Sequence, residues 1–352
     1  MKNHSIPARG RGAVSNPTGR FEQAQVAPEL DETWEEEIPG PKTTFFRDHS
    51  KSILTRNTSP DIPFSVSINP YRGCEHGCIY CYARPTHEYL GLSAGIDFET
   101  KIFVKENAPE LLRKELMKPG YEVDSITISG ITDCYQPAER RFQVTRRCLE
   151  VLAEFRNPFA IISKNHLVTR DIDIIAPMAQ QNAAMVFVTI TSLDADLCAS
   201  MEPRTSRPEA RLKAIRQLSE AGIPVGVMVA PVVPGLTDHE MPKILEAAAQ
   251  AGAKMAGFVP LRLPHGVKDL FSEWLAAHYP DRKNKVLARI KEIRGGKLND
   301  ANFGSRMEGE GEFAEMLRMM FRNYTKKFGL NQREFHLNRS LFQKPGEQMG
   351  LF

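Results

Sequence analysis

The sequence has no long apolar run, and cysteine and tryptophan are scarce. No hydrophobic segment approaches the roughly 20 residues that a membrane-spanning helix needs. Residues 1–7 include basic side chains but no apolar stretch, which argues against a secretory signal. Six cysteines in 352 residues do not suggest a disulfide scaffold. We therefore expect a cytoplasmic protein with reduced thiols and no membrane partner.

An excess of charge of one sign is also lacking, because the formal net charge is only +3. The chain as a whole is thus not a polycation. An apolar fraction of 41% supports one large domain or two ordinary ones with a real core. The charge is unevenly placed, however, since residues 282–344 contain 15 Lys and Arg against 7 Asp and Glu, a local net charge of +8.

The chain divides into three parts by composition. Residues 1–45 are rich in Gly, Pro, Asn, Arg and Glu, and we expect a mostly disordered, flexible leader that can become ordered near the core. Residues 46–265 form the predicted core. Residues 266–352 are expected to be a helical, basic extension that ends in a polar tail.

The core is expected to contain six repeats of a strand followed by a helix. Its strand candidates are nearly continuous apolar runs, which is typical of parallel strands covered by helices on both faces. Strands are predicted at Ser65–Ile68, Ser125–Ser129, Phe159–Ser163, Met185–Thr191, Val225–Val232 and Lys254–Leu261. Helices are predicted at Pro109–Met117, Phe142–Phe155, Asp171–Gln181, Arg207–Ala221 and Asp238–Ala251, and in the extension at Leu270–His278, Arg282–Arg294 and Gly311–Lys327.

Three of the six cysteines, Cys74, Cys78 and Cys81, form a Cys-x-x-x-Cys-x-x-Cys run. Three thiolates this close can hold three irons of a [4Fe–4S] cluster and leave the fourth iron open to a substrate or cosubstrate. The alternative is a zinc site completed by His76 or His87. Because the run directly follows the first core strand, at the end where β/α enzymes place their chemistry, we favour the iron–sulfur interpretation.

The cysteine run and its surroundings resemble the radical S-adenosylmethionine superfamily, and within it the spore photoproduct lyase-like group related to DNA repair photolyases. The resemblance covers about residues 50–265 and rests on the segments Asn69–Pro85, Ser129–Glu139, Ser163–Asp171 and Ser192–Pro203. It implies an α/β fold, a partial (β/α)6 TIM-like barrel.

The same resemblance implies the chemistry. The three cysteines would hold a [4Fe–4S] cluster whose open iron binds S-adenosyl-L-methionine. One-electron reduction would cleave this cosubstrate to a 5′-deoxyadenosyl radical, which abstracts a hydrogen atom from the substrate. A flavodoxin- or ferredoxin-type reductant would supply the electron.

Four residues are assigned to the cosubstrate by this resemblance. Tyr80 precedes the third cysteine, and Gly130, at the end of the second strand, lets the backbone approach a ligand closely. Lys164 ends the third strand, where its charge suits the cosubstrate's carboxylate; an ordinary surface lysine is the alternative. Ser192 ends the fourth strand and is expected to hydrogen-bond the ribose or the carboxylate.

Further residues at the same edge leave alternatives open. Asp133 and Glu139 flank a loop that either binds a ligand or is simply solvated. Asp194 is either a ligand contact or a helix N-cap. Glu202 either forms a salt bridge that orders its loop or lies at the mouth of the site. Residues 232–233, both valine, either contact the adenine or belong to the core.

The other three cysteines lie outside the run and have different predicted roles. Cys134 follows the second strand, as does a cysteine that returns a hydrogen atom in spore photoproduct lyases, and the resemblance makes it a candidate hydrogen-atom donor. Its alternative is a small packed side chain. Cys148 lies on the apolar face of a predicted helix and is expected in the core, while Cys198 has no visible role.

The basic extension suggests a partner. Its cations and rings suit the phosphates and unstacked bases of a nucleic acid, or form an ordinary solvated face; the rings are Tyr324, Phe328, Phe335 and Phe342. The last five residues, Gln348–Phe352, resemble the peptide by which bacterial repair and replication proteins bind the sliding clamp. The alternative is that they pack into the chain's own core.

The predicted function is therefore a radical S-adenosylmethionine enzyme that acts on nucleic acid, in particular on a DNA lesion. A second hypothesis keeps the radical and changes the substrate to RNA or protein. A third, of another class, is a non-catalytic iron–sulfur or zinc adaptor for nucleic acid.

Overall fold

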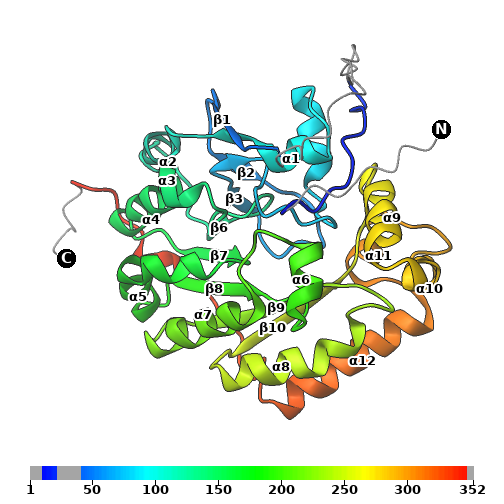
Figure 1. Cartoon of the computed structure of the whole chain (residues 1–352). Coiled ribbons are helices and arrows are strands. Elements are labelled where there is room, and N and C mark those ends of the chain that lie inside the picture. Colours follow the sequence, from blue (N-terminus) through cyan, green and yellow to red (C-terminus); the bar gives the residue numbers. More distant parts are fainter. Residues whose placement is uncertain (1–9, 22–40, 347–352) are drawn as a thin grey trace.

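The computed structural model describes residues 10–21 and 41–346 (Figure 1). Its main sheet has the strand order β10-β9-β8-β7-β6-β3-β2. The six strands from β3 to β10 in this sheet are parallel neighbours in chain order, and β2 pairs antiparallel with β3 at one edge. The bounds are β2 Leu54–Arg56, β3 Val66–Ile68, β6 Ile126–Ile128, β7 Phe159–Ser163, β8 Ala184–Thr189, β9 Val225–Val232 and β10 Met255–Pro260. The predicted partial (β/α)6 TIM-like barrel is confirmed.

The strands are mostly apolar, and most of their buried apolar side chains belong to the main hydrophobic cluster. β3 and β6 are buried at every position. Phe187 of β8 lies against Gly226 of β9, where an added Cβ would stand 2.3 Å from the ring. A side chain there would push the two strands apart, so this glycine permits the close packing of β8 and β9.

The predicted core helices lie around the outside of the sheet (Figure 1). They are α2 Ala108–Leu116, α4 Val144–Glu154, α5 Ile172–Gln180, α7 Pro208–Glu220 and α8 Met241–Gln250. α4 buries Val144, Cys148, Val151 and Leu152, the apolar face that its 3.6-residue spacing predicts. The predicted ends of these helices differ from the observed ones by a few residues, as is usual for helix termini.

A second sheet is absent from the sequence predictions. It has the order β1-β5-β4, formed by β1 Thr44–Arg47, β5 Lys101–Val104 and β4 Tyr71–Arg72. These strands are short and partly exposed, so no sustained alternation identifies them. β4 directly precedes the cysteine run, and this sheet therefore anchors the start of that loop.

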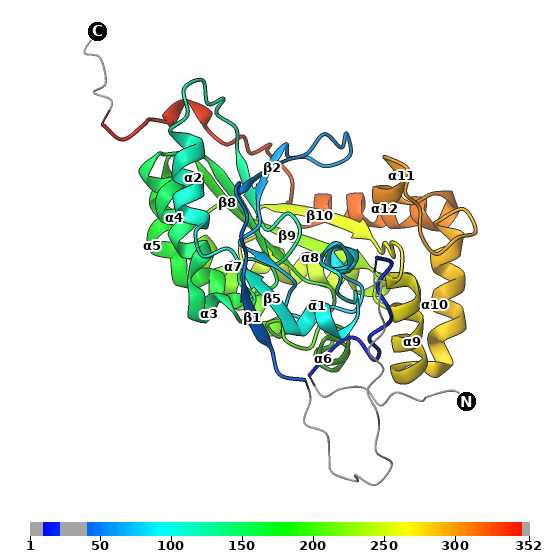
Figure 2. The ribbon, with the colours of Figure 1, turned by 90° about the horizontal axis from the view of Figure 1, so that it is seen from above.

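After β10 the chain is helical, as predicted. α9 Val267–His278 and α10 Pro280–Glu292 lie at the end of the molecule opposite α2, α4 and α5 (Figure 2). α12, Gly311–Lys327, packs against α8, and the short α11, Ser305–Glu308, precedes it. No helix within residues 10–21 and 41–346 is long and apolar enough to cross a membrane.

The two edges of the incomplete barrel are joined by the extension. Asp61 lies between β2 and β3, at one edge of the sheet. Its carboxylate accepts the Gly304 amide at 3.0 Å and pairs with the Arg306 guanidinium at 2.6 Å. Because Arg306 belongs to α11, which follows the edge strand β10, these contacts span the open side of the barrel.

Part of the predicted leader lies on the core. Ser15 donates a hydrogen bond to Glu273 of α9 at 2.5 Å, and Arg20 pairs with Glu88 at 2.6 Å. Residues 10–21 thus contact both the core and the helical extension.

Asp61→Asn should show how much the contact between Asp61 and Arg306 contributes to the stability of the fold. The Arg306 hydrogen bond lowers the pKa of Asp61 to about 2, whereas an unfolded aspartate titrates near about 3.9. A depressed folded pKa adds stability above the unfolded pKa, and this stability is lost as the pH falls through the folded pKa. Melting temperatures measured against pH should therefore show a wild-type advantage at neutral pH that shrinks between about pH 4 and 2. An advantage that is independent of pH would contradict this account.

Candidate active site

The cysteine run forms a tight loop at the carboxyl end of β3. Cys74 and Cys78 are buried and Cys81 is partly exposed. The Cys74 amide donates to the Phe98 carbonyl at 2.9 Å, and the Cys81 amide donates to the Cys78 carbonyl at 3.2 Å. Gly77, between the first two cysteines, has a φ of +67°, a conformation that side chains rarely adopt. The spacing of the thiols is thus set by a turn that requires glycine.

A buried ion pair holds this loop from inside. Arg84 pairs with Glu99 at 2.6 Å, and both side chains are fully buried. The same guanidinium donates to the carbonyls of Cys78 at 2.9 Å and Gly77 at 3.2 Å. The N–H groups of this one rigid guanidinium therefore hold the backbone of the cysteine loop in place.

The N-terminal segment completes this arrangement. The Glu99 carboxylate also accepts the amides of Gly12 at 3.1 Å and Ala13 at 2.8 Å. A Cβ added to Gly12 would stand 1.8 Å from the Gly77 carbonyl oxygen. The leader thus lies directly on the cysteine loop, and only glycine allows this approach.

Burial and nearby charges oppose thiolates at this loop. Burial and then the Asp133 charge raise the pKa of Cys74 well above its usual range. Burial and then the Glu202 charge raise the pKa of Cys78 to about 12, and burial also raises the pKa of Cys81. Thiolates in such a place need a bound cationic centre to stabilise them.

Lys164 brings a positive charge to the thiols. It follows β7, and its charge lowers the pKa of Cys78 and Cys81, although burial outweighs it. Its Nζ lies 6.0 Å from the centre of the Tyr80 ring. Among the described residues no carboxylate forms an ion pair with it. The structure thus brings Lys164 and Tyr80 together beside the cysteines, as expected from the sequence.

Tyr80 is buried and held by polar contacts. Its hydroxyl hydrogen-bonds the Glu202 carboxylate and lies 3.2 Å from the Thr191 hydroxyl oxygen. Glu202 in turn pairs with fully buried Arg211, which donates to the Thr189 carbonyl at 3.1 Å. The salt-bridge alternative for Glu202 is thus confirmed, and the pair fixes the ring against the ends of β8.

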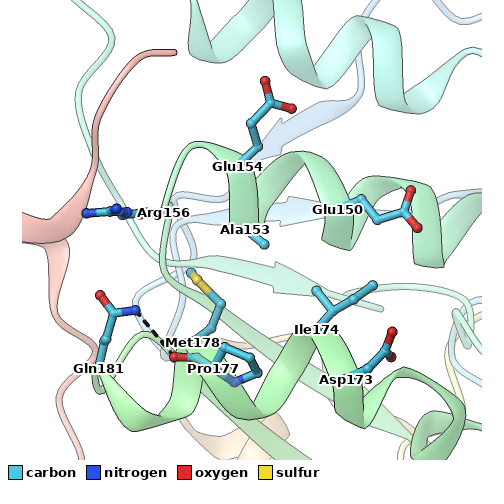
Figure 3. A pocket seen from close by; sticks show the side chains of 9 residues that line it. All are labelled: Glu150, Ala153, Glu154, Arg156, Asp173, Ile174, Pro177, Met178 and Gln181. Carbon is cyan, nitrogen blue, oxygen red and sulfur yellow. Dashed lines mark hydrogen bonds between the residues drawn. The ribbon is translucent and has the colours of Figure 1, made fainter. Parts of the chain in front are cut away.

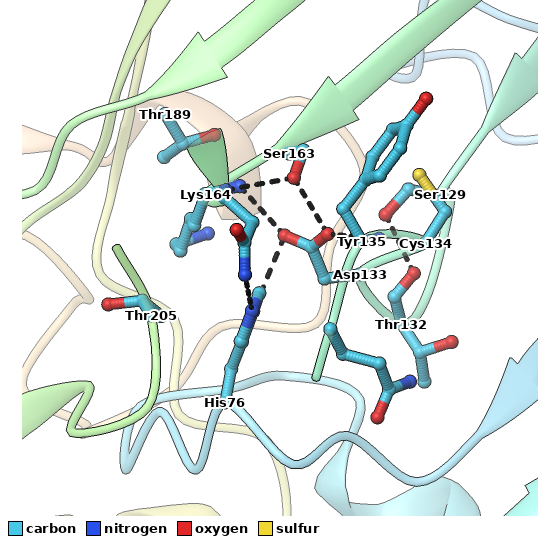
Figure 4. Close-up of polar contacts among 12 residues, drawn as sticks. His76, Ser129, Thr132, Asp133, Cys134, Tyr135, Ser163, Lys164, Thr189 and Thr205 are labelled. Carbon is cyan, nitrogen blue, oxygen red and sulfur yellow. Dashed lines mark hydrogen bonds and ion pairs between the residues drawn. The ribbon is translucent and has the colours of Figure 1, made fainter. Parts of the chain in front are cut away.

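Asp133 joins the ends of β6 and β7 (Figure 4). It accepts the Ser163 hydroxyl at 2.8 Å, the Lys164 amide at 2.7 Å and the Tyr135 amide at 2.9 Å, and it lies 3.5 Å from His76. Burial opposes its charge, but the charge and hydrogen bond of His76 lower the pKa of Asp133 well below its usual range. Asp133 therefore positions Lys164 and is not part of a solvated loop.

Glu139, the other carboxylate of that predicted loop, is also internal. It is fully buried, hydrogen-bonds the Tyr71 hydroxyl, accepts the Thr145 amide at 2.9 Å and pairs with Arg170 at 2.8 Å. Its oxygens are occupied by the protein. Neither a solvated loop nor direct ligand binding describes Glu139.

Gly130 lies two residues after the end of β6. The residue before it, Ser129, has a φ of +81°, which is unusual for a side-chain-bearing residue. The Gly130 carbonyl accepts the Tyr82 hydroxyl at 2.6 Å, and an added Cβ would stand 3.0 Å from Ser67 of β3. The glycine thus allows the segment after β6 to approach β3 and the cysteine loop.

Ser192 is buried and already engaged. Its hydroxyl donates to Glu240 at 2.6 Å and accepts the Asp194 amide at 3.0 Å. Binding a ribose or carboxylate would require it to give up Glu240, so the structure places this residue in a supporting position. Asp194 accepts the amides of Asp196 and Leu197 at the start of α6, Ala195–Met201, which confirms the N-cap alternative.

Several candidates lie within the core. Val232 and Val233 are fully buried. Cys134 is fully buried in the main hydrophobic cluster, and its carbonyl accepts the Thr145 hydroxyl at 2.7 Å. Cys148 lies in the same cluster, as predicted. Cys198 is buried, with its Sγ 3.6 Å from the Ser192 carbonyl oxygen.

The rings of the extension mostly face inward. Tyr324 and Phe328 pack against the core and stack on each other at 5.9 Å between centroids. Phe342 lies 5.3 Å from Tyr121, and only Phe335 is an exposed ring of this predicted set. Three of the four rings are therefore partly buried against the core. The predicted clamp-binding peptide, Gln348–Phe352, lies outside the described residues.

A surface hollow between α4 and α5 is separate from this site (Figure 3). Its lining includes Glu150 and Ala153 of α4 and Ile174 and Pro177 of α5. None of the predicted site residues lines it. It is a groove between two outer helices, on the side of the fold away from the strand ends that carry the cysteines.

Comparison with known proteins agrees with this geometry. Residues 68–248 match the family model described as the radical SAM superfamily. The chain belongs to the radical SAM superfamily. An uncharacterized protein of Mycobacterium tuberculosis is 37% identical over 253 residues, which cover 71% of this chain and 73% of that protein. An uncharacterized protein of Methanocaldococcus jannaschii is 31% identical over 173 residues, 49% of this chain and 62% of the relative.

The solved structures add a fold relationship for this radical SAM enzyme. A mutant spore photoproduct lyase with bound AdoMet and dinucleoside spore photoproduct matches with a TM-score of 0.58. The match covers 81% of this chain and 80% of the lyase, at 17% identity. At this identity the likeness establishes a shared fold. The predicted superfamily and fold are thus confirmed.

The three cysteines fit the cluster that this superfamily implies. They are free, lie on one glycine-dependent turn, and raise one another's pKa, so they share one small region. Within the described ranges no three His, Cys, Asp or Glu side chains are grouped closely enough to hold a single metal ion. In a [4Fe–4S] cluster each of the three thiolates would bind a different iron.

Sequence reasoning missed the residues that support the cysteine loop. Gln136 accepts the Glu75 amide at 2.9 Å and donates to the Gly73 carbonyl at 3.1 Å. Arg84, paired with Glu99, also holds the backbone of the cysteine loop. Arg84 stands three residues after the last cysteine, but Glu99 lies in the short helix α1, Ile96–Thr100, and no local signal pairs the two.

Gly12→Ala should weaken cluster binding. The added methyl would collide with the Gly77 carbonyl, and relieving an overpacked contact costs about 1–3 kcal/mol. The leader or the cysteine loop must then move, and we expect less iron and sulfide per chain after anaerobic reconstitution. Gly266→Ala is the matched control, because nothing lies within 4 Å of a Cβ added there. Equal cluster content in both variants would refute this role of Gly12.

Proposed function

We propose that this radical SAM enzyme reductively cleaves S-adenosyl-L-methionine at a [4Fe–4S] cluster held by Cys74, Cys78 and Cys81, and acts on nucleic acid. The observation that carries the proposal is the set of three adjacent thiols with Lys164 beside them. The cluster, when bound, supplies an open iron for the cosubstrate and one electron for its cleavage. The residues around it must bind and orient the cosubstrate.

Lys164 is suited to bind the cosubstrate's carboxylate. Its ammonium has no carboxylate partner among the described residues, and Asp133 fixes its backbone at 2.7 Å. An ammonium that is held near the site and not internally paired gains a charge-assisted hydrogen bond from an incoming carboxylate. Gly130, at the end of the neighbouring strand β6, leaves space for the backbone to approach the same ligand.

Tyr80 is suited to orient the cosubstrate rather than to exchange protons. Burial and then the charge of Cys78 raise the pKa of Tyr80 well above its usual range, so the ring stays neutral at physiological pH. The Glu202–Arg211 pair fixes its hydroxyl. A fixed, neutral ring beside Lys164 offers an apolar surface to a bound ligand and excludes water from the thiols.

Cys78→Ala should abolish S-adenosylmethionine cleavage, because a cluster with one thiolate fewer is not held. Anaerobically reconstituted protein with dithionite and S-adenosylmethionine should form 5′-deoxyadenosine, measured by chromatography, and the variant should form none. Cys148→Ala, in the core of α4, is the control and should retain cleavage. A fully loaded wild-type cluster that yields no 5′-deoxyadenosine would favour the non-catalytic adaptor.

Two features favour a nucleic-acid substrate. The chain shares its fold with spore photoproduct lyase, and its extension carries the local charge of +8 over residues 282–344. A DNA lesion is the substrate we propose, with radical modification of RNA or protein as the alternative. Cys134 remains a candidate hydrogen-atom donor only if the loop after β6 moves, because its thiol is fully buried.

Deuterium transfer should identify the substrate class. The proposed radical takes a hydrogen atom from the substrate, so deuterated, ultraviolet-irradiated DNA should give deuterium-labelled 5′-deoxyadenosine, detected by mass spectrometry. Deuterated but undamaged DNA is the control. Label that comes from RNA or protein and not from irradiated DNA would overturn the proposed substrate and leave the cleavage chemistry intact.

A further inference from the structure

Arg262 forms no direct ion pair among the described residues, although the charges of Asp61 and Asp300 act on it. It follows the edge strand β10, and its Nε is buried without a hydrogen-bond partner. Its Nη1 donates to the Met307 sulfur at 3.1 Å, and a thioether sulfur is a weak acceptor. No carboxylate within the described ranges forms an ion pair with it. A largely buried cation without a partner is costly to the fold and indicates a place for an anion.

The neighbouring arginines are committed elsewhere. Arg294 donates to the carbonyls of Pro260, Leu261 and Ser305, and Arg306 pairs with Asp61. Burial and then the charge of Arg306 lower the pKa of Arg262, so the fold does not favour this charge. Of these three arginines, Arg262 is the one whose guanidinium can still bind an anionic ligand.

Exposed rings lie beside this cation. The Arg262 guanidinium is 6.0 Å from the centre of the Tyr82 ring, which is 50% exposed and directly follows Cys81. Phe303 is 60% exposed, with the Arg306 guanidinium 4.6 Å from its ring centre. Most of the aromatic rings that were predicted to stack on bases pack against the core. The rings of Tyr82 and Phe303, in contrast, are exposed to solvent.

Arg262 and Tyr82 lie at the open side of the barrel. Arg262 follows β10, at one edge of the sheet, and Tyr82 belongs to the loop after β3, near the other edge. Tyr82 also donates to the Gly130 carbonyl at 2.6 Å. A ligand at Arg262 and Tyr82 would thus lie next to the cysteine loop and could reach the cosubstrate.

We propose that Arg262 and Tyr82 form a substrate-binding subsite, in which Arg262 holds a phosphodiester of a single-stranded or locally unpaired nucleic acid and Tyr82 stacks with an adjacent base. The inference rests on the proposed nucleic-acid substrate and adds the residues that would recognise it. A guanidinium fork matches two phosphate oxygens, and an exposed ring stacks on a base that has left the duplex.

The test is oligonucleotide binding by the reconstituted holoenzyme, followed by fluorescence anisotropy with a fluorescein-labelled single-stranded oligodeoxynucleotide. Arg262→Gln should raise the dissociation constant about tenfold, as expected for loss of one charge-assisted hydrogen-bonding group. The slope of log affinity against log salt should fall by about 0.7, the value for one phosphate contact on a single strand. Arg262→Lys keeps the charge and should keep the wild-type slope while losing part of the affinity. Arg216→Gln, on the exposed face of α7, is the charge-matched control and should bind as wild type.

Two results would overturn the inference. One is wild-type affinity and salt slope in Arg262→Gln. The other is equal loss of polyglutamate binding in that variant, which would assign a general anion site or an acidic peptide partner. The proposed function is tested separately by 5′-deoxyadenosine formation without substrate, which should occur in the wild type and to the same extent in Arg216→Gln. If wild type forms none, the proposed function fails; if it forms as expected while binding ignores Arg262, this inference alone fails.

Discussion

The buried ion pair of Arg84 and Glu99 is the interaction on which the site depends. Each side chain is fully buried, so neither charge is solvated, and each is stabilised by the other and by backbone groups. Arg84 binds the carbonyls of the cysteine loop, and Glu99 binds the amides of Gly12 and Ala13. Loss of one partner would leave a buried charge uncompensated, at a cost of about 3–5 kcal/mol. The pair therefore couples the N-terminal segment to the position of the thiols.

A second buried pair, Arg211 and Glu202, acts in the same way on the opposite side of the thiols. It fixes Tyr80 and the ends of β8, while Asp133 fixes the start of the segment that carries Lys164. A buried pair is weak support for stability when compared with apolar packing, because both charges lose their hydration. Its value here is positional, since each pair fixes several backbone groups around one small volume.

The repeating part of the fold could be predicted from the sequence because burial imposes a period. All six parallel strands and the main helices follow from apolar runs and from faces such as that of α4. The cysteine run and Lys164 could be found because they directly follow strands. Ser192 also closely follows a strand, yet its partner, Glu240, comes from elsewhere in the chain. Sequence position identifies the residues at a strand end, but it does not tell which of them are already bonded to the protein.

That distinction separates the supporting residues of this site from those that remain for ligands. Buried carboxylates near the thiols have an internal partner of opposite charge, as Glu99 and Glu202 do. Lys164 and Arg262 have none among the described residues, and they lie on different sides of the cysteine loop. Lys164 is next to the thiols and faces Tyr80, whereas Arg262 is at the open side and faces Tyr82. Two cations without an ion pair, each beside a tyrosine, suit two anionic groups, namely the carboxylate of the proposed cosubstrate and a phosphate of the proposed substrate.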